Sequence, residues 1–222
     1  MRPTLKITAA AALAGLAAAC TGSLFKTQLP VTQTYQLGAL QSPASGVAPL
    51  DALVLVARPI VAPGLDSDHI ALVHPGRRLD YYAGGVWGAP VPEVIQNVVV
   101  ASLQNTGRLR GVQRDLANFR PDFVLQLDVR AFQAEYADGG APHVRVDLIA
   151  TIGRLSDRRS VLSFAAASDE AAAANTMTDV TAAFDRALQA ATGTLLAQVI
   201  DYVGREGSGR AAPPPDSAPP SQ

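Results

Sequence analysis

The chain has 222 residues, with 18 Lys or Arg, 19 Asp or Glu and a formal net charge of −1 at pH 7. Positive and negative residues are mixed along it and no run of Lys or Arg occurs, which excludes a basic nucleic-acid-binding surface. The only cysteine is Cys20, so no intramolecular disulfide framework can form and the fold must be stable through its core alone.

The first twenty residues have the layout of a bacterial lipoprotein signal. Arg2 and Lys6 give a positive start, and the uncharged residues 7–19 end in Leu-Ala-Ala-Ala directly before Cys20. This is the pattern of a secretory signal, whereas a membrane-spanning helix needs about 20 apolar residues. We predict a signal peptide at residues 1–19, cleavage before Cys20, and acyl chains such as palmitate on that cysteine.

Other interpretations of Cys20 stay open. Ala17 stands where such signals usually have a branched apolar residue. A lone exported cysteine can also be a free thiol, a buried small hydrophobe or half of an intermolecular disulfide. Plain secretion is the main alternative to lipidation. Thr21 replaces the aspartate that tends to retain lipoproteins in the inner membrane, which favours the outer membrane.

Composition divides the rest of the chain into three parts. Residues 20–32 are predicted to be a lipidated tether, residues 33–203 one domain, and residues 204–222 a disordered Pro-rich tail. The Gly, Ser and Pro content of the tail cannot bury enough apolar surface to offset the entropy of ordering it. The domain between the two ends is long enough for one substantial core.

The first half of the domain alternates short apolar runs with turns. A helix is predicted over residues 93–107 because Val91, Ile95, Val98 and Ser102 share one flank. Gly84-Gly85 is expected to break the chain before Trp87. The other predicted elements are strands at residues 33–37, 52–57 and 109–113, and a hairpin of residues 69–74 and 77–82 around Pro75-Gly76.

The second half predicts three antiparallel strands followed by a long helix. Strict alternation marks strands at residues 123–135, 144–152 and 160–167, joined by turns. On the solvent-exposed face of these strands, ion pairs across strands are expected among Asp128, Arg130, Arg145 and Asp147. Each exposed pair adds about 0–1 kcal/mol to the stability. The helix, at residues 179–203, carries an apolar stripe of Phe184, Leu188, Ala191, Leu195 and Tyr202. The predicted fold class is α+β: a mainly antiparallel sheet with two amphipathic helices packed on one face.

The sequence contains no catalytic constellation that we can identify. His69 and His74 are expected on opposite faces of one strand, which argues against shared metal ligation, and His143 follows a turn. No nucleophile elbow, phosphate-binding loop, zinc-protease motif or dinucleotide fingerprint occurs. Asp and Glu residues are plentiful, but no sequence pattern brings two of them together as a catalytic pair. We expect no catalytic residues, no metal site and no cofactor.

The order of these features resembles the ABC-type transport auxiliary lipoproteins. The resemblance rests on the lipoprotein signal, Tyr81-Tyr82, a short loop with Trp87, Ala89 and Pro90, and a helix that reaches Asn105-Thr106-Gly107. It covers about residues 34–203. Family members often have an acidic residue between the Trp and the Pro, whereas this chain has Gly88-Ala89, so any role of that acid is not carried over.

The resemblance implies a non-catalytic partner of an ABC permease and ATPase that work with a periplasmic mammalian-cell-entry (MCE) domain protein. Such systems move phospholipids or other hydrophobic molecules across the periplasm. The protein would be anchored in the inner leaflet of the outer membrane of a Gram-negative bacterium, facing the periplasm. Trp87 and Tyr82 are the candidate partner or lipid contacts, with packing of Trp87 in the core as the alternative.

Two competing functions remain at this point. One is a structural or pilot-type lipoprotein of another envelope complex, and the other is a periplasmic enzyme of an unrecognised kind. Ring-like partners would also be consistent with self-assembly into a homo-oligomer. Substrate and direction of transport do not follow from the sequence.

Overall fold

The computed structural model describes residues 32–42, 46–115, 119–137, 139–156 and 161–208. Cys20, the tether and the residues beyond 208 therefore lie outside the described residues. The elements in chain order are β1 (Gln33–Tyr35), β2 (Leu50–Val56), β3 (Ile60–Val61), β4 (His69–His74), β5 (Arg78–Trp87), α2 (Val91–Asn105), β6 (Leu109–Gln113), β7 (Phe123–Glu135), β8 (His143–Arg154), β9 (Val161–Ala171) and α3 (Met177–Ser208).

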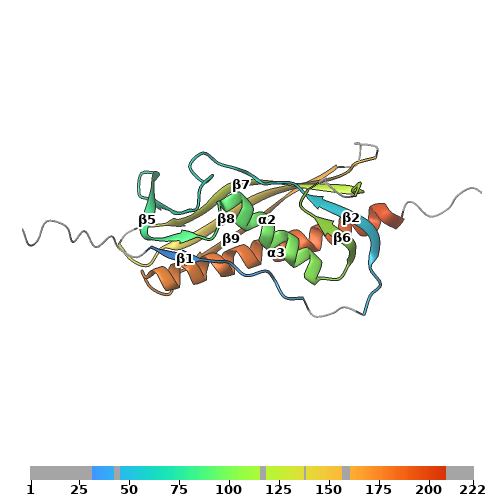
Figure 1. The fold of residues 1–222 in the computed structure, drawn as a ribbon. Coiled ribbons are helices and arrows are strands. Elements are labelled where there is room, and N and C mark those ends of the chain that lie inside the picture. Colours follow the sequence, from blue (N-terminus) through green and yellow to red (C-terminus); the bar gives the residue numbers. More distant parts are fainter. Residues whose placement is uncertain (1–31, 43–45, 116–118, 138, 157–160, 209–222) are drawn as a thin grey trace, which may run out of the picture. The chain divides into compact units, whose positions relative to one another are not determined.

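The 13-residue strand β7 is the centre of a nine-stranded sheet (Figure 1). Along one edge it pairs with β8 in an antiparallel register, and β8 pairs in turn with β9. Its other edge is shared by β2, β3 and β4, which pair with successive stretches of it in parallel. Strand β6 extends the sheet beyond β2, while β5 and then β1 extend it beyond β4.

The two helices form a layer over the sheet. Helix α3 packs on β9, β8, β7 and β2, and α2 packs on β6, β2 and β3 and contacts α3. The buried side chains of both helices and of the strands form one core, which includes the whole stripe predicted for α3. The α+β class is confirmed, with the refinement that the sheet is mixed: the β7–β8–β9 meander and the β4–β5 hairpin are antiparallel, and the other pairings are parallel. Neither described helix is both long and apolar enough to span a bilayer.

A β-bulge interrupts the alternation of β7. The register shifts between Val129 and Ala131, so that Ala131 lies opposite Asp147 and Phe132 opposite the buried Val146. The strict alternation predicted over residues 123–135, which would have turned Ala131 inward after Val129, is therefore broken at this point. Because one extra residue reverses which side chains face the core, Phe132 takes that place and is 1% exposed.

Three predicted boundaries were also wrong. Strand β5 continues through Gly84 and Gly85 to Trp87, because a Cβ on Gly85 would lie 2.8 Å from the Tyr35 ring and glycine lets β1 approach. Strand β9 runs four residues further than expected, to Ala171. Helix α3 continues from Val203 through Ser208, so a tail that begins at Gly204 begins too early.

The charged pairs on the open face of the meander also differ from the prediction. Arg130 lies 3.8 Å from Asp128, and Arg145 lies 3.5 Å from Asp147, each pair along a single strand. The predicted pairing of these four residues across strands was wrong, because the register places Asp128 opposite Ile149 and Asp147 opposite Ala131. All of the side chains except Asp147 are at least half exposed, so the pairs contribute little to stability.

Candidate functional site

The junction between β5 and α2 ties four parts of the domain together. The Trp87 N–H donates to Asp68 O (2.7 Å), and the Gly88 N–H donates to Tyr35 O (2.9 Å). One turn later, the Val91 N–H donates to Ser67 O (3.0 Å). Strand β1, the loop before β4, the end of β5 and the start of α2 are thus joined by backbone hydrogen bonds.

The Trp87 side chain lies in the core at this junction, at 1% exposure. Its ring centroid is 5.1 Å from that of Phe184 on α3, in edge-to-face geometry, and 5.7 Å from that of Phe132 on β7. Phe132 and Phe184 complete the triangle at 5.0 Å. The Trp87 Nε1–H finds no acceptor among the described residues. A direct contact of this ring with a partner or a lipid would therefore require the core to open.

Tyr82 is half-buried and begins a short chain of polar contacts. Its hydroxyl lies 2.8 Å from that of Tyr136, and the Tyr136 hydroxyl donates to Asn175 Oδ1 (2.6 Å). Because a phenol has one proton, Tyr82 is the donor to Tyr136. Burial raises the pKa of Tyr82 far above its ordinary value, and the hydrogen bond and the charge of Tyr136 raise it further. Tyr82 therefore stays neutral at any physiological pH.

The segment that follows β1 is held on the helices as a strap, which we define as residues 36–42. The Gly38 N–H donates to Asp185 Oδ1 of α3 (2.8 Å), and the Leu40 N–H donates to Ser102 Oγ of α2 (3.0 Å). Asn105 Nδ2 of α2 donates to Leu40 O (2.9 Å). Leu37 and Leu40 pack against the core beneath. Together with β1, this segment joins the start of the described chain to both helices.

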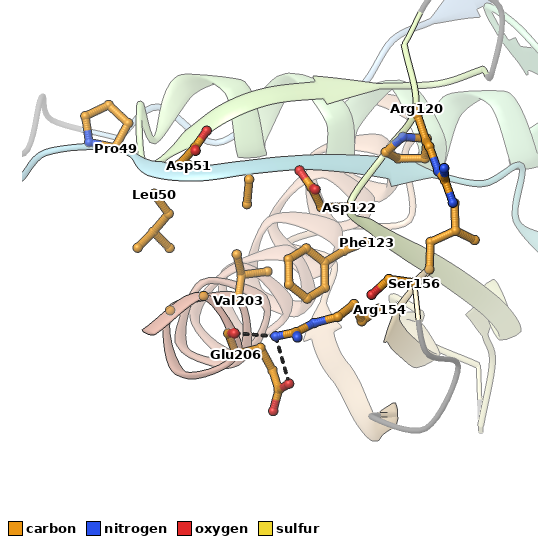
Figure 2. A pocket seen from close by; sticks show the side chains of 15 residues that line it. Pro49, Leu50, Asp51, Arg120, Asp122, Phe123, Arg154, Ser156, Val203 and Glu206 are labelled. Carbon is orange, nitrogen blue, oxygen red and sulfur yellow. Dashed lines mark hydrogen bonds and ion pairs between the residues drawn. The ribbon is translucent and has the colours of Figure 1, made fainter. Parts of the chain in front are cut away.

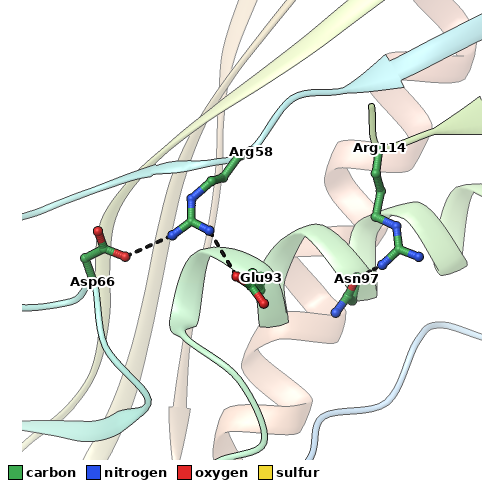
Figure 3. A network of polar contacts seen from close by, with 5 residues as sticks. All are labelled: Arg58, Asp66, Glu93, Asn97 and Arg114. Atoms are coloured by element: carbon green, nitrogen blue, oxygen red, sulfur yellow. Dashed lines mark hydrogen bonds and ion pairs between the residues drawn. The ribbon is translucent and has the colours of Figure 1, made fainter. Parts of the chain in front are cut away.

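Charged side chains connect α2 to the loops around it (Figure 3). The Arg58 guanidinium bridges Asp66 and Glu93, at 3.2 Å from each carboxylate. Further along α2, Arg114 donates to Asn97. The three members of the Arg58 bridge are each about half exposed or more, so we expect the bridge to orient the loops with only about 0–1 kcal/mol per pair.

A cavity lies where α3 ends, at the starts of β2 and β7 and the end of β8 (Figure 2). Its volume is about 950 Å³. Arg154 reaches across it to the end of α3, where it pairs with Glu206 Oε2 (3.1 Å) and donates to the Glu206 carbonyl. The same guanidinium lies over the Phe123 ring, 5.8 Å from its centroid.

Two of the charged side chains that line this cavity, Asp122 and Arg154, serve the fold. Asp122 accepts from the Leu53 N–H (2.9 Å) and pairs with Arg110 (3.0 Å), which holds the starts of β2, β6 and β7 together. Arg154 caps the last carbonyls of α3, the helix end at which a cation is favourable. The cavity is thus an open hollow with structural charges, and it contains no arrangement of nucleophile, base and oxyanion donor.

The histidines do not form a metal site. Each lies beside one carboxylate: His69 is 3.3 Å from Asp68, His74 is 3.9 Å from Asp80, and His143 is 2.8 Å from Asp169. Within the described ranges, no three His, Cys, Asp or Glu side chains come close enough to hold an ion. The side chains of His69 and His143 are exposed, and that of His74 is partly exposed.

The sequence profile of the ABC-type transport auxiliary lipoprotein component matches residues 35–195, most of the chain and nearly all of its folded part. The chain belongs to this family. The resemblance inferred from the order of Tyr82, Trp87 and α2 is therefore confirmed. No curated protein sequence matches the chain.

Two solved structures are similar to this chain in fold. Protein XCC0632 from Xanthomonas campestris is 27% identical, with a TM-score of 0.69, and the match covers 80% of this chain and 99% of that one. A second, uncharacterized protein is 14% identical, with a TM-score of 0.60, over 76% of this chain and 99% of the other. The second likeness shows the fold alone.

Within the family fold, the structure separates the predicted site residues. Trp87 lies in the core, Tyr82 lies in the Tyr136–Asn175 chain, and Cys20 is outside the described residues. The sequence analysis missed Phe132, Tyr136 and the strap. Phe132 was missed because the β-bulge reverses the alternation of β7, so regular spacing places its side chain on the wrong face. Tyr136 was missed because it comes directly after the end of β7, next to the predicted turn. The strap has no regular apolar periodicity, because its backbone groups make its polar contacts and only Leu37 and Leu40 pack on the core.

Proposed function

We propose that the protein is a non-catalytic lipoprotein, anchored through Cys20 in the inner leaflet of the outer membrane and facing the periplasm. There it serves as the auxiliary component of an ABC transporter whose periplasmic part is an MCE-domain protein. The transported molecules would be phospholipids or other hydrophobic substrates. The observation that carries the proposal is the family match over residues 35–195, joined to a lipoprotein signal that ends at Cys20.

The geometry agrees with a docking role. The cavity at the end of α3 is lined by Asp122 and Arg154, which serve the fold. Each of the three histidines lies beside a single carboxylate. Trp87 and Tyr82 would support docking indirectly, since the junction and the polar chain they form fix how β5, α2 and α3 meet.

The anchor is tested by Cys20→Ser. If Cys20 carries the lipid, the variant should lose the acyl chains, which contribute about 0.8 kcal/mol per buried CH₂ and anchor stably when two or more are present. We expect metabolic labelling with palmitate and outer-membrane fractionation of the mature form to be lost together. Thr21→Ser, which leaves the cysteine intact, is the matched control. Mature Cys20→Ser protein that still fractionates with the outer membrane would overturn the anchor.

The partner is tested by affinity purification of the lipidated protein from detergent-solubilised envelopes. Recovery of an MCE-domain protein together with an ABC permease or ATPase is the expected result. Recovery of secretion or pilus components instead would support the pilot-type alternative. Repeated recovery of neither group, with the anchor intact, would contradict the transporter role without affecting the lipidation result.

A further inference from the structure

A second hollow lies on the open face of the sheet, the face that the two helices do not cover. Its volume is about 650 Å³. Strands β7 and β8 form its floor, and the loop after β3 and the β4–β5 hairpin form its walls. Three arginines line it from three different segments: Arg77 of the hairpin turn, Arg130 of β7 and Arg145 of β8. We call it the arginine hollow, and it has the side chains that an anionic ligand requires.

Arg77 is the arginine that the fold itself explains least. Its φ of 64° lies in the left-handed region, which favours glycine or asparagine, so the turn gives no reason for an arginine there. The residue is exposed, and its guanidinium makes no ion pair or hydrogen bond with any part of the chain that the structure describes. Residues in such backbone conformations cluster at ligand-binding sites. The Arg77 guanidinium is therefore available to a ligand.

The β-bulge of β7 turns Arg130 toward the hollow. Val129 and Phe132 face the core, so the bulge leaves two consecutive residues, Arg130 and Ala131, on the open face, where both line the hollow. The ion pair of Arg130 with Asp128 is long, at 3.8 Å. Since a guanidinium has five N–H donors, Arg130 keeps donors for a ligand.

The two carboxylates that line the hollow are already engaged. Asp147 pairs with Arg145 (3.5 Å), and Glu135 accepts from Gln133 Nε2 (2.9 Å). With His74 neutral, three arginines and two carboxylates give the lining a net charge of +1. Guanidinium groups match the oxygens of a phosphate in bidentate geometry, which makes a phosphate the anion that this lining fits best.

One wall of the hollow is apolar and held in place. It includes Pro63 and Leu79, and Leu79 is 39% exposed. The loop that contains Pro63 is fixed to β5, because the Tyr81 hydroxyl donates to the Gly64 carbonyl (2.8 Å). A wall that is fixed in advance lowers the entropic cost of binding. Arginines beside an exposed apolar wall fit an amphiphile whose phosphate is joined to an apolar body.

The hollow lies toward the end of the sheet from which β1 comes. Strand β1 runs parallel to β5 and away from the β4–β5 turn, so Gln33 is its residue nearest to that turn. The connection from Cys20 to Gln33 can span at most about 45 Å. A lipid on Cys20 would therefore keep this end of the domain close to the phospholipids of the membrane.

We propose that the arginine hollow binds the phosphate of a phospholipid headgroup. Arg77 and Arg130 donate to the phosphate, and the apolar part of the lipid lies along Pro63 and Leu79. This contact rests on the proposed function for the place where the lipid is met, and it deepens that function by giving this chain a direct contact with phospholipid.

The headgroup contact is tested by isothermal titration calorimetry of the mature chain carrying Cys20→Ser, which has no acyl chains of its own. The probe is dihexanoyl-phosphatidylglycerol below its critical micelle concentration. We expect saturable binding that Arg77→Gln and Arg130→Gln each weaken by about 2–10-fold through the loss of one contact. Both arginines are exposed, so the variants should fold, as circular dichroism would verify.

Arg120→Gln is the matched control. It removes the same charge from an exposed arginine outside the hollow and should bind the lipid as the parent chain does. Absence of saturable binding by the parent chain would overturn the proposal, and so would an unchanged affinity in both Arg77→Gln and Arg130→Gln. If affinity purification recovers the transporter while the lipid does not bind, the contact alone is wrong and the proposed function is unaffected.

A phospholipid is distinguished from a free phosphate by two further probes, glycerol 3-phosphate and inorganic phosphate. Both lack the apolar body, so they should bind more weakly than the phospholipid and should respond in the same way to Arg77→Gln. Leu79→Ala should weaken binding of the phospholipid alone, because only the phospholipid reaches the apolar wall. Inorganic phosphate that binds as tightly as the phospholipid would show a free-phosphate site and would overturn the lipid assignment.

Discussion

At the scale of single residues, the aromatic triangle is the point at which sheet and helices are joined. Trp87 comes from β5, Phe132 from the bulged part of β7 and Phe184 from α3, and all three are almost completely buried. Because Trp87 is the only tryptophan of the chain, its fluorescence reports on this point alone. We expect blue-shifted emission in the native protein and a red shift when the core opens.

Trp87→Ala should lower the free energy of unfolding by about 3–5 kcal/mol, since a large buried ring is replaced by a cavity. Trp87→Phe should lower it less, because phenylalanine keeps part of the ring contacts and removes an indole N–H that has no acceptor among the described residues. Urea unfolding followed by circular dichroism measures both. Leu79→Ala, at a 39% exposed position, is the control and should change the value by no more than about 0.5 kcal/mol. Equal effects of Trp87→Ala and Leu79→Ala would contradict the core role.

The hydroxyl of Tyr82 predicts a particular response to alkaline pH. Its raised pKa means that the unfolded chain releases this proton first, at about pH 10. The stabilisation from the neutral phenol is fully present below that pH and is lost as pH rises toward the folded pKa. The free energy of unfolding should therefore decrease with pH above about 10, and Tyr82→Phe should reduce that slope. Urea titrations between neutral and alkaline pH test this.

Tyr81→Phe is the matched control for this slope. Tyr81 lies next to Tyr82 but is exposed, and its hydroxyl donates to the Gly64 carbonyl (2.8 Å). If the alkaline slope changes equally in both variants, the Tyr82–Tyr136 contact is not its source. At neutral pH, Tyr82→Phe should cost about 1 kcal/mol for the lost hydrogen bond.

At the scale of elements, the strap depends on a few side chains of the helices. Ser102→Ala removes the acceptor of the Leu40 N–H and should destabilise the protein by about 1 kcal/mol. If Ser102 supports the strap specifically, amide hydrogen exchange of residues 38–42 should become faster by more than the loss of global stability explains. The exchange of β7 should change only by as much as the global unfolding free energy does. Ser163→Ala removes a hydroxyl on the exposed face of β9 and is the control. Faster exchange throughout the domain would mean that Ser102 supports the core and not the strap.

The same scale shows what the sequence could and could not predict. Helix α2, helix α3 and the β7–β8–β9 meander were predicted because each shows the period of its own structure over many residues. The two-residue β3 and the passage of β5 through Gly84-Gly85 were not, since a glycine pair reads as a break unless the approach of Tyr35 is known. Of the candidate site, Trp87 was identified through the family resemblance. Its burial against Phe132 and Phe184 was not predicted, because these residues are distant in the sequence.

At the scale of the whole molecule, the parallel pairings were beyond the reach of sequence patterns. Strands β2, β3 and β4 share one edge of β7, with the short β3 between the longer two. Local periodicity indicates that a strand exists and which face is buried, but it carries no information on which distant strand lies beside it. We expect such pairings to form slowly, because the loops between the strands must close first.

This arrangement predicts an order of local opening. Strand β7 is hydrogen-bonded on both edges and its inward-facing side chains are fully buried, so its amides should exchange only through global unfolding. Strands β1 and β6 each have a partner on one edge only, are short and should exchange through local opening at lower free energy.

Native-state hydrogen exchange at increasing urea measures both: β7 should follow the global unfolding free energy and its full urea dependence, whereas β1 and β6 should show a weak dependence. Strand β8, paired with β7 and β9, serves as the internal comparison and should follow β7. Exchange of β7 amides by local opening would contradict this prediction. It would mean that the strands on the two edges of β7 can separate without unfolding the whole domain.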